Sequence, residues 1–340
     1  SSDLAIEPAG VAVPNCQMGG ITEARVLITP DGSVEVHSDR TEIGQGVEIS
    51  HATIVADILG MDTAHIHVKR VTSDFIGQGP LSSRGAVYPA SAVAKAAKLL
   101  RKKVVQCAGS LMKIPADQVV LEKGYIYPAD APEKKISYAQ FADKMFFFPG
   151  PRGLDPEILK AHDHLLDVTT TWYSPTTPES GSSYTSFCVS ADIAVVEVDI
   201  DTGVTQIVKY VHVHDAGTII NAQVVDGQIQ GGIVQGIGEA LYEGLNYDEN
   251  GQLMNTSFSN YLIPTSVEAP DIEIAHLETP SPFSETGSKG MGEAPIIGSK
   301  AVILDAIEDA LSDFGIRVND APATPEKVRK WIRQASGQNQ

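Results

Sequence analysis

Alternating apolar and polar residues predict paired strands in the first part of the chain, and longer stretches with helical spacing follow them. A Pro30-Asp31-Gly32 turn separates two such strands. Gly60 ends the first predicted helix, because glycine readily adopts the left-handed conformation found at helix C-termini. The predicted elements are a hairpin of residues 25–29 and 33–37, a helix over residues 48–60, a strand over residues 66–71 and a helix over residues 89–106.

A run dense in proline and glycine over residues 146–156 predicts the boundary between two lobes. The elements predicted beyond it are a hairpin of residues 190–199 and 204–213, a glycine-rich helix over residues 224–242, an amphipathic helix over residues 297–311 and a last helix with Thr324 as N-cap and Pro325 at its first position. We therefore predict a mixed α+β fold with two lobes, residues 1–160 and residues 161–340.

Composition and charge narrow the classes of function. Hydrophobic residues make up 42% of the chain and charged residues 20%, as in a globular protein with a large core. The net charge of −18 opposes nucleic-acid binding. The three cysteines form no CxxC pair, so we expect no disulfide framework and no iron–sulfur or zinc site in this chain. No apolar stretch is long enough to span a membrane and residues 1–4 lack the features of an export signal, so we expect a cytoplasmic protein.

Two loops that precede helices contain residues suited to anion binding. Gly44, Gln45 and Gly46 stand before the first helix, where backbone N–H groups and the helix dipole attract anions, although a tight strand-to-helix turn explains the same pattern. The second loop precedes the helix of residues 89–106 and could hold phosphate oxygens through N–H groups and hydroxyls, or be a plain connection. Its residues are Ser82, Ser83, Arg84 and Gly85.

Glycines recur inside the helix predicted over residues 224–242, and each costs roughly 1 kcal/mol relative to alanine. Close approach to a ligand or to another helix would offset that cost. Gln228 and Gln235 lie two turns apart on one face and offer both donors and acceptors, which suits the edge of a pterin. Close helix packing with both amides on a wet surface is the alternative.

A third glycine cluster delivers one carboxylate just before a helix. Its residues are Lys289, Gly290, Met291, Gly292 and Glu293. A single glutamate in a loop is usually solvated, but burial beside a cofactor would raise its pKa and suit it to general-base catalysis.

Two histidines alternate with valines in a predicted strand and therefore face the same side. We expect His212 and His214 to be residues of the polar face, and we assign no metal site to them.

Taken together, these clusters resemble the xanthine dehydrogenase and aldehyde oxidase family of molybdenum hydroxylases, in the C-terminal half of its molybdopterin-binding region. The resemblance covers about residues 26–333. Ala222 stands where the family usually has proline, and Gly85 where a hydroxyl residue is common. The elements that carry the resemblance are Gly44-Gln45-Gly46, Ser82-Ser83-Arg84-Gly85, Asp215-Ala216-Gly217 with Asn221, Gly227-Gln228, Gly231-Gly232, Tyr261-Leu262-Ile263-Pro264-Thr265 and Lys289-Gly290-Met291-Gly292-Glu293.

The resemblance implies a cofactor and a set of partners. The cofactor is molybdopterin with molybdenum, in a dinucleotide form such as molybdopterin cytosine dinucleotide, and it provides the redox chemistry. FAD and [2Fe-2S] clusters are expected on partner chains, a flavin subunit and an iron–sulfur subunit. The first half of the molybdenum region has no counterpart in these residues, so we expect a separate chain to supply it.

The resemblance also implies the reaction, in which Glu293 is the general base and an oxygen from water is inserted at an electrophilic carbon of an N-heteroaromatic or aldehyde substrate. A same-family acyl-CoA reductase or CO dehydrogenase subunit is an alternative. A non-catalytic cofactor-binding or assembly subunit is another. The residues implied to bind the cofactor are Gly44, Gln45, Gly46, Ser82, Ser83, Arg84, Gly85, Gln228, Gln235, Lys289, Gly290, Met291 and Gly292.

Overall fold

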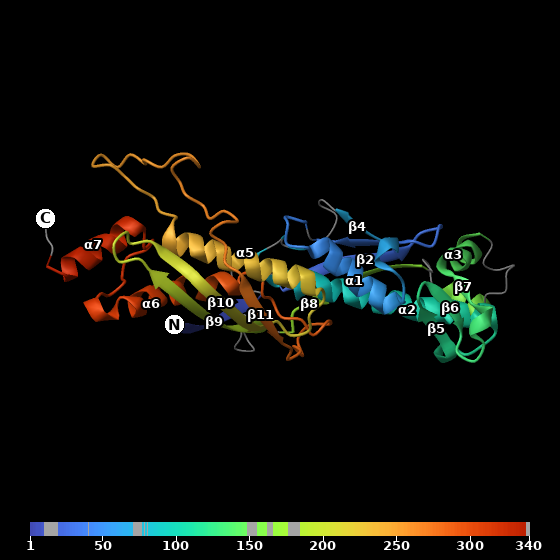
Figure 1. Ribbon diagram of the computed structural model, residues 1–340. Helices are drawn as coiled ribbons and strands as arrows, with labels where there is room; N and C mark the ends of the chain where they lie inside the picture. Colours follow the sequence, from blue (N-terminus) through green and yellow to red (C-terminus); the bar gives the residue numbers. More distant parts are fainter. Residues whose placement is uncertain are drawn as a thin grey trace.

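The computed structural model describes residues 1–9, 20–39, 41–70, 77, 79, 81–147, 155–161, 166–175 and 184–337. Figure 1 shows an elongated molecule in which the first lobe lies between the second lobe and a small outlying sheet along the long axis. Two four-stranded sheets, one in each lobe, form the framework. The mixed α+β fold predicted from the sequence is confirmed.

The first lobe is built on a sheet in the order β4-β3-β2-β8. Strands β2 (Ile21–Ile28) and β3 (Val34–Ser38) form the antiparallel hairpin predicted around the Pro30-Asp31-Gly32 turn, β4 (Ile66–Arg70) is parallel to β3, and β8 (Asp167–Tyr173) is antiparallel to β2. Their alternating burial places one face of the sheet against α1 (Val47–Leu59) and α2 (Tyr88–Met112). At the far end lie β5 (Val119–Glu122), β6 (Tyr125–Pro128), β7 (Ile136–Ser137) and α3 (Tyr138–Phe146). The short helix α4 (Pro156–Ala161) precedes β8.

The second lobe is built on a sheet in the order β1-β9-β10-β11. Its strands are β1 (Ser2–Ala9), β9 (Ser186–Val198), β10 (Thr205–Asp215) and β11 (Ile272–Leu277). The predicted second hairpin is confirmed, because β9 and β10 pair antiparallel. Helices α5 (Ala222–Leu241) and α6 (Ala294–Ala310) pack against each other, and α6 also packs against β1 and β9. The last helix, α7 (Pro325–Ala335), has Thr324 as its N-cap, as predicted.

The two lobes do not follow each other cleanly along the chain. Strand β1 belongs to the second sheet although it begins the sequence, and β8 belongs to the first sheet although it follows residue 160. Most of the run expected to mark the boundary, residues 148–154, lies outside the described residues. The division at residues 160 and 161 therefore stays a prediction.

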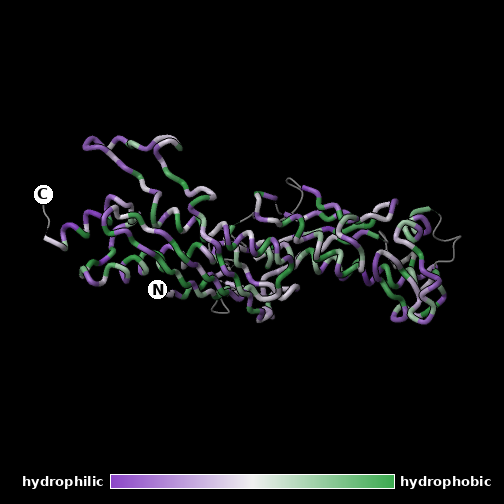
Figure 2. The backbone as a smooth tube through the Cα atoms, in the orientation of Figure 1, coloured by the Kyte–Doolittle hydropathy of each residue, from purple (hydrophilic) through white to green (hydrophobic). Residues whose placement is uncertain are grey.

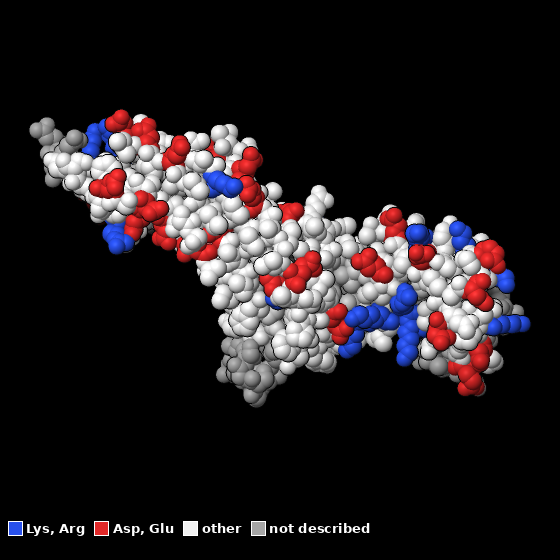
Figure 3. Space-filling model, turned by 60° about the horizontal axis from the view of Figure 1, so that its bottom comes forward, with Lys and Arg blue, Asp and Glu red and all other residues white. Residues whose placement is uncertain are grey.

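Hydropathy and charge follow this architecture. Apolar segments lie mainly in the packed helices and strands, whereas the long segment between α5 and β11 extends away from the body of the second lobe (Figures 1 and 2). Figure 3 shows many charged side chains toward both ends of the molecule and fewer in the middle of the visible face, where one group of acidic side chains is surrounded by uncharged surface. Within the described residues, no helix has the length and apolar character needed to cross a membrane.

The two histidines of β10 are buried, so the prediction that they lie on a polar face is wrong. His212 Nδ1 lies 2.8 Å from Asp192 Oδ1, which provides a polar partner inside the lobe. His214 packs between the rings of His212 and His276, with centroid distances of 5.5 Å and 4.9 Å. Burial, reinforced by the two neighbouring rings, lowers the pKa of His214 to about 4.

Several glycines of α5 permit its close approach to α6. A methyl group added at Gly232 would lie 2.9 Å from Pro295 Cβ, and one added at Gly236 would collide with Ser299 Oγ. By contrast, an added methyl group at Gly231 would meet no atom within 4 Å. Helix packing, the alternative left open by the sequence, therefore explains Gly232 and Gly236.

This difference between Gly236 and Gly231 allows the same substitution to be compared at a crowded and at an open position of α5. Gly236→Ala is expected to destabilise the assembled protein by about 1–3 kcal/mol, the usual cost of overpacking, and to lower its melting temperature. Gly231→Ala is expected to leave stability unchanged or to raise it by up to about 1 kcal/mol, because alanine is the better helix former. Equal melting temperatures for the two variants would contradict the helix contact.

Candidate cofactor and base site

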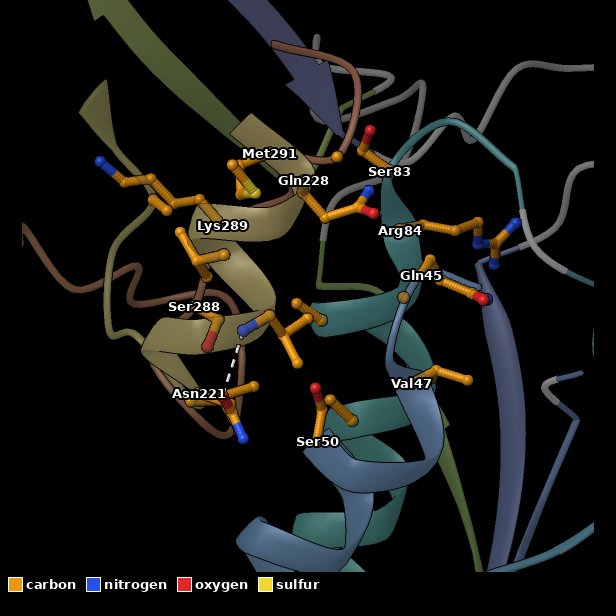
Figure 4. Close-up of a pocket in the computed structure, with 18 of the residues that line it drawn as sticks. Gln45, Val47, Ser50, Ser83, Arg84, Asn221, Gln228, Ser288, Lys289 and Met291 are labelled. Carbon is orange, nitrogen blue, oxygen red and sulfur yellow. Dashed lines mark hydrogen bonds between the residues drawn. The ribbon is translucent and has the colours of Figure 1, made fainter. Parts of the chain in front are cut away.

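The largest set of predicted site residues meets in one cavity of about 250 Å³, between the N-terminal ends of α1 and α2 on one side and α5 with the loop before α6 on the other (Figure 4). Residues more than two hundred positions apart in the sequence line it together. The predicted residues among its lining are Gln45, Ser82, Ser83, Arg84, Gly85, Gln228, Lys289, Met291, Gly292 and Glu293. Four further residues predicted to bind the cofactor are not among the lining: Gly44, Gly46, Gln235 and Gly290.

Glu293 stands at the N-cap position of α6 and is held by Ser83. The Glu293 amide donates to Ser83 Oγ at 2.9 Å, and the same hydroxyl donates to Glu293 Oε2 at 3.4 Å. Burial beside a cofactor is the condition for the raised pKa that a general base needs, but Glu293 is exposed in this structure. Any desolvation of this carboxylate must therefore come from a ligand or a partner that covers the cavity.

The serines before α2 adopt an unusual backbone conformation. Ser82 has φ of 47° and Ser83 has φ of 46°, in the left-handed region that non-glycine residues rarely enter. Such strain persists only where the surroundings impose it, and it concentrates at functional sites. Here it places the Ser83 hydroxyl against the first turn of α6, so a loop of the first lobe orients a carboxylate of the second.

Gln228 and Gly292 form the wall beside this serine. A Cβ at position 292 would lie 3.2 Å from Gln228 Nε2 and 3.3 Å from Ser83 Oγ, which makes glycine the residue that leaves both polar groups accessible. Gln235, expected to act with Gln228, is exposed on α5 and does not line the cavity. The predicted pair of glutamines is therefore reduced to Gln228 at this cavity.

The loop before α1 already contains an anion of its own. The amides of Gly44 and Gly46 each donate to Glu42 Oε1 at 2.9 Å, and the Glu48 amide donates to Glu42 Oε2 at 3.0 Å. Although burial opposes it, these N–H groups hold the pKa of Glu42 below its usual value. A ligand phosphate would have to displace Glu42 to use the same amides. Gln45 is half-buried and forms hydrogen bonds within its own loop.

The two predicted cations at the cavity are both engaged. Arg84 is fully buried, its guanidinium lies 4.0 Å from the ring centroid of Tyr88, and its side chain points away from Gln228 in Figure 4. Lys289 Nζ lies 2.8 Å from Asp215 Oδ2 and donates to Thr279 Oγ1 at 2.8 Å. Although burial opposes ionisation, these partners hold the pKa of Asp215 well below its usual range.

Backbone contacts fix the loop that carries Glu293. The Lys289 amide donates to the Ala216 carbonyl at 2.8 Å, and Gly217 and Ser288 form an isolated antiparallel bridge. Gly217 has φ of 64°, and an added Cβ would collide with the Gly287 carbonyl. Lys98 of α2 pairs with Glu285 at 2.8 Å, which ties the same loop to the first lobe. The loop is thus held from both lobes.

The aromatic side chains of residues 146–147 and 184–187 do not line the Glu293 cavity. Tyr184 and Phe187 lie in a separate cavity of about 540 Å³, together with Phe283, and Lys289 lines both cavities. Phe146 and Phe147 are exposed at the far end of the first lobe, beside α3. Phe148 lies outside the described residues.

The donor set of the cavity fits an organic cofactor edge. Its polar groups include the amide of Gln228, the Ser83 hydroxyl and the side chain of Asn221, between apolar walls that include Val47 and Met291 (Figure 4). A planar ring with donors and acceptors along one edge suits an amide and a hydroxyl across a glycine cradle. In the described parts of the chain, no group of three or more histidine, cysteine, aspartate or glutamate side chains is placed to hold a metal ion.

Comparison with known proteins connects the chain to a cofactor-binding family. The molybdopterin cofactor-binding domain family matches residues 4–270. The chain is 36% identical over 332 residues to the nicotine 6-hydroxylase large subunit of Paenarthrobacter nicotinovorans, covering 95% of this chain and 39% of that protein. It is 31% identical over 313 residues to a xanthine dehydrogenase molybdenum-binding subunit of Escherichia coli O157:H7, covering 91% of this chain and 39% of that one.

A comparison with solved structures points to the same family. Quinoline 2-oxidoreductase from Pseudomonas putida 86 superposes with a TM-score of 0.83 at 33% identity, over 98% of this chain and 42% of that one. The chain therefore belongs to the molybdopterin cofactor-binding domain family of the molybdenum hydroxylases, as its motifs indicated. It spans about two fifths of the length of the relatives that it matches.

Two acidic residues at the site did not stand out in the sequence. Glu42 lies two residues before Gly44, and a carboxylate at this distance from glycines at a helix start is a recognisable signal for an internal cap. Glu7 lies beside Glu293 but is nearly three hundred residues away in the sequence. The pairing of β1 with β9 and the packing of β1 on α6 bring it there, and no local pattern indicates either contact.

Proposed function

We propose that the chain is the part of a molybdenum-cofactor subunit that carries the catalytic base, and that the assembled enzyme inserts a water-derived oxygen at an electrophilic carbon. The observation that supports this most is the convergence of separate glycine-rich segments on one cavity with Glu293 at its wall. A cavity that only had to hold a cofactor would not need a carboxylate held by Ser83 in this position.

Gln228, Ser83 and the backbone at Gly292 would hold the molybdopterin, which supplies the redox chemistry when bound. We propose a dinucleotide form such as molybdopterin cytosine dinucleotide. Its phosphates would rest on backbone N–H groups of the Ser82 to Gly85 loop, because Arg84 and Lys289 are already engaged.

Within this proposal Glu293 accepts a proton from the water-derived nucleophile at its Oε atoms. The Ser83 hydroxyl orients the carboxylate, since it contacts both the amide and Oε2 of the same residue. Covering the cavity would exclude water and strengthen the base, because a desolvated carboxylate binds a proton more tightly.

The structure exposes surfaces that suit a large partner. Strands β1 and β9 present an apolar outer face, which we call the open sheet face. The segment between α5 and β11 adds further exposed apolar side chains, among them Phe258 at 79% and Val267 at 86% exposure. Contiguous apolar surface of this kind marks protein contacts. The residues of the open sheet face are Leu4, Ile6, Phe187, Val189, Ile193 and Val195.

We infer that the first half of the molybdenum region covers these surfaces, since relatives are more than twice as long as this chain. An iron–sulfur subunit with [2Fe-2S] clusters and a flavin subunit with FAD complete the proposed complex and remove electrons from the cofactor. A cytoplasmic location belongs to the same proposal.

For the substrate we propose an N-heteroaromatic ring. The chain is 36% identical to a nicotine 6-hydroxylase subunit and 33% identical to a quinoline 2-oxidoreductase. These relatives favour N-heteroaromatic rings over aldehydes and carbon monoxide. An acyl-CoA reductase and a non-catalytic assembly subunit are the alternatives that an experiment must separate.

The test is to purify the protein with its partners, measure bound molybdenum, and supply N-heteroaromatic and aldehyde substrates in water enriched in heavy oxygen. We expect hydroxylation of a heteroaromatic ring with label taken from water. Bound molybdenum without turnover of either class would instead favour the assembly role, and label taken from dioxygen would contradict the proposed reaction.

A further inference from the structure

Glu7 is a carboxyl group in an inward-facing position of a strand. It lies in β1, opposite Cys188 of β9, and is 3% exposed, whereas its neighbour Ile6 is 59% exposed. The other inward residues are Ala5, which is buried and apolar as expected for a strand that packs on α6, and Asp3, which is only partly buried. Burying a carboxyl group without a paired cation is costly, so its presence here requires an explanation.

The end of Glu7 lies at the N-terminus of α6, beside the Ser83 hydroxyl and the amides of Glu293 and Ala294. Neither carboxyl oxygen makes a hydrogen bond of standard geometry within the described residues, although both are buried. The Ser83 hydroxyl thus stands between two carboxyl groups, one buried and one at the cavity.

The elements packed against β1 carry other titratable groups, which are not the main influences on the Glu7 carboxyl group. Cys188 of β9 is a buried thiol whose pKa burial raises, with a contribution from Glu7. Asp192 of β9 and Asp305 of α6 act on Asp3, at the other end of β1. The charge that acts on Glu7 itself is that of Glu293.

Burial is the largest influence on Glu7, and together with the Glu293 charge it raises the pKa of Glu7 to about 7. The Ser83 hydroxyl and the two amides of the α6 N-terminus oppose this rise. Glu7 therefore changes charge near neutral pH, next to the proposed base.

We propose that Glu7 is a positioning residue for Glu293, which acts by competing for the Ser83 hydroxyl that also contacts the base. This inference rests on the proposed function, in which Glu293 is the general base. When Glu7 is protonated, Ser83 is free to donate to Glu293 Oε2 and favours its carboxylate form. When Glu7 ionises, it draws the Ser83 hydroxyl to itself, and its negative charge increases the proton affinity of Glu293.

The test is Glu7→Gln in the assembled, molybdenum-loaded enzyme, because glutamine keeps the size and removes the ionisation. In the wild type, kcat should rise by about threefold through pH 7, since a like charge shifts a carboxyl pKa by about one unit and proton transfer gains part of that shift. Glu7→Gln should lose this step. Asp3→Asn is the matched control, because Asp3 is a partly buried carboxyl of the same strand that faces Asp305, and it should retain the step.

A second readout does not depend on activity. The Glu7 carboxyl binds its proton more tightly in the folded chain, so its contribution to stability is full below about pH 4.5 and is lost as pH rises through about 7. The melting temperature of Glu7→Gln relative to wild type should therefore increase from about pH 5 to about pH 8. A pH-independent difference, with the kcat step retained, would overturn the proposal and leave Glu7 a merely structural residue.

These outcomes are distinct from failure of the proposed function. If Glu293→Gln keeps full turnover, Glu293 is not the base and the positioning role is overturned with it. If Glu293→Gln is inactive and Glu7→Gln behaves as wild type at every pH, the proposed function stands and the inference about Glu7 fails.

Discussion

Replacing Glu293 by glutamine is expected to lower kcat by about 10²–10⁴-fold while molybdenum remains bound, which is the usual contribution of a general base. Glutamine keeps the shape of the side chain and its contact with Ser83 Oγ but cannot accept the proton. The measurement is steady-state turnover by the purified complex, with molybdenum content determined on the same sample. Because the backbone amide at position 293 still donates to Ser83 Oγ, we expect the melting temperature to change little.

Glu285→Gln is the matched control for this prediction. Glu285 lies in the same loop, eight residues before Glu293, but its carboxylate pairs with Lys98 at the surface and does not line the cavity. An exposed ion pair of this kind contributes less than about 1 kcal/mol, so turnover should stay within about twofold of wild type. Similar losses in both variants would indicate a disturbed loop and would contradict a specific role for Glu293.

Lys289→Met is expected to have the largest effect on stability. The side chains of Lys289 and Asp215 are only 14% and 16% exposed, so removing the cation leaves a mostly buried carboxylate unpaired. Loss of one partner of such a pair costs about 3–5 kcal/mol. Thermal unfolding of the assembled protein should show a lower melting temperature, together with a loosened Glu293 loop, because the Lys289 backbone also anchors to Ala216.

The pH dependence of this variant has a defined sign. Asp215 has a pKa below its usual value in the folded protein, so its stabilising contribution is present above the ordinary value of 3.8 and is lost as pH falls through the folded one. Lys289→Met should be less stable than wild type near neutral pH, and the difference should shrink on acidification. The double variant that combines Lys289→Met with Asp215→Asn should recover part of the lost stability. No recovery would show that the ion pair is not the cause.

Local sequence patterns predicted most of the secondary structure, because each element carries its own signal. The alternation in β2 and β3, the Gly60 stop of α1 and the Thr324 cap of α7 act within a few residues. The position of β1 was not predictable in the same way. Its pairing with β9 joins residues separated by about half of the chain, and nothing in residues 2–9 specifies which sheet they enter.

The candidate site shows the same division between local and long-range information. Its glycine clusters and Glu293 were visible because glycine at a close approach is a local requirement, as at Gly292. Three features depended on packing between distant segments: the exposure of Glu293, the occupation of the Gly44 and Gly46 amides by Glu42, and the burial of Glu7 behind the base. The prediction for the histidines of β10 was wrong for the same reason, because their partners Asp192 and His276 come close to them only in the folded sheet.

The most direct test of the proposed site is to locate the metal. Crystals of the assembled complex, measured at the molybdenum absorption edge, would give an anomalous peak at its position. We expect that peak beside the cavity lined by Ser83, Gln228 and Glu293, with the pterin along the Gln228 wall. A peak away from this cavity, or a pterin bound to another surface of the chain, would contradict the assignment of the cavity and of Glu293 as its base.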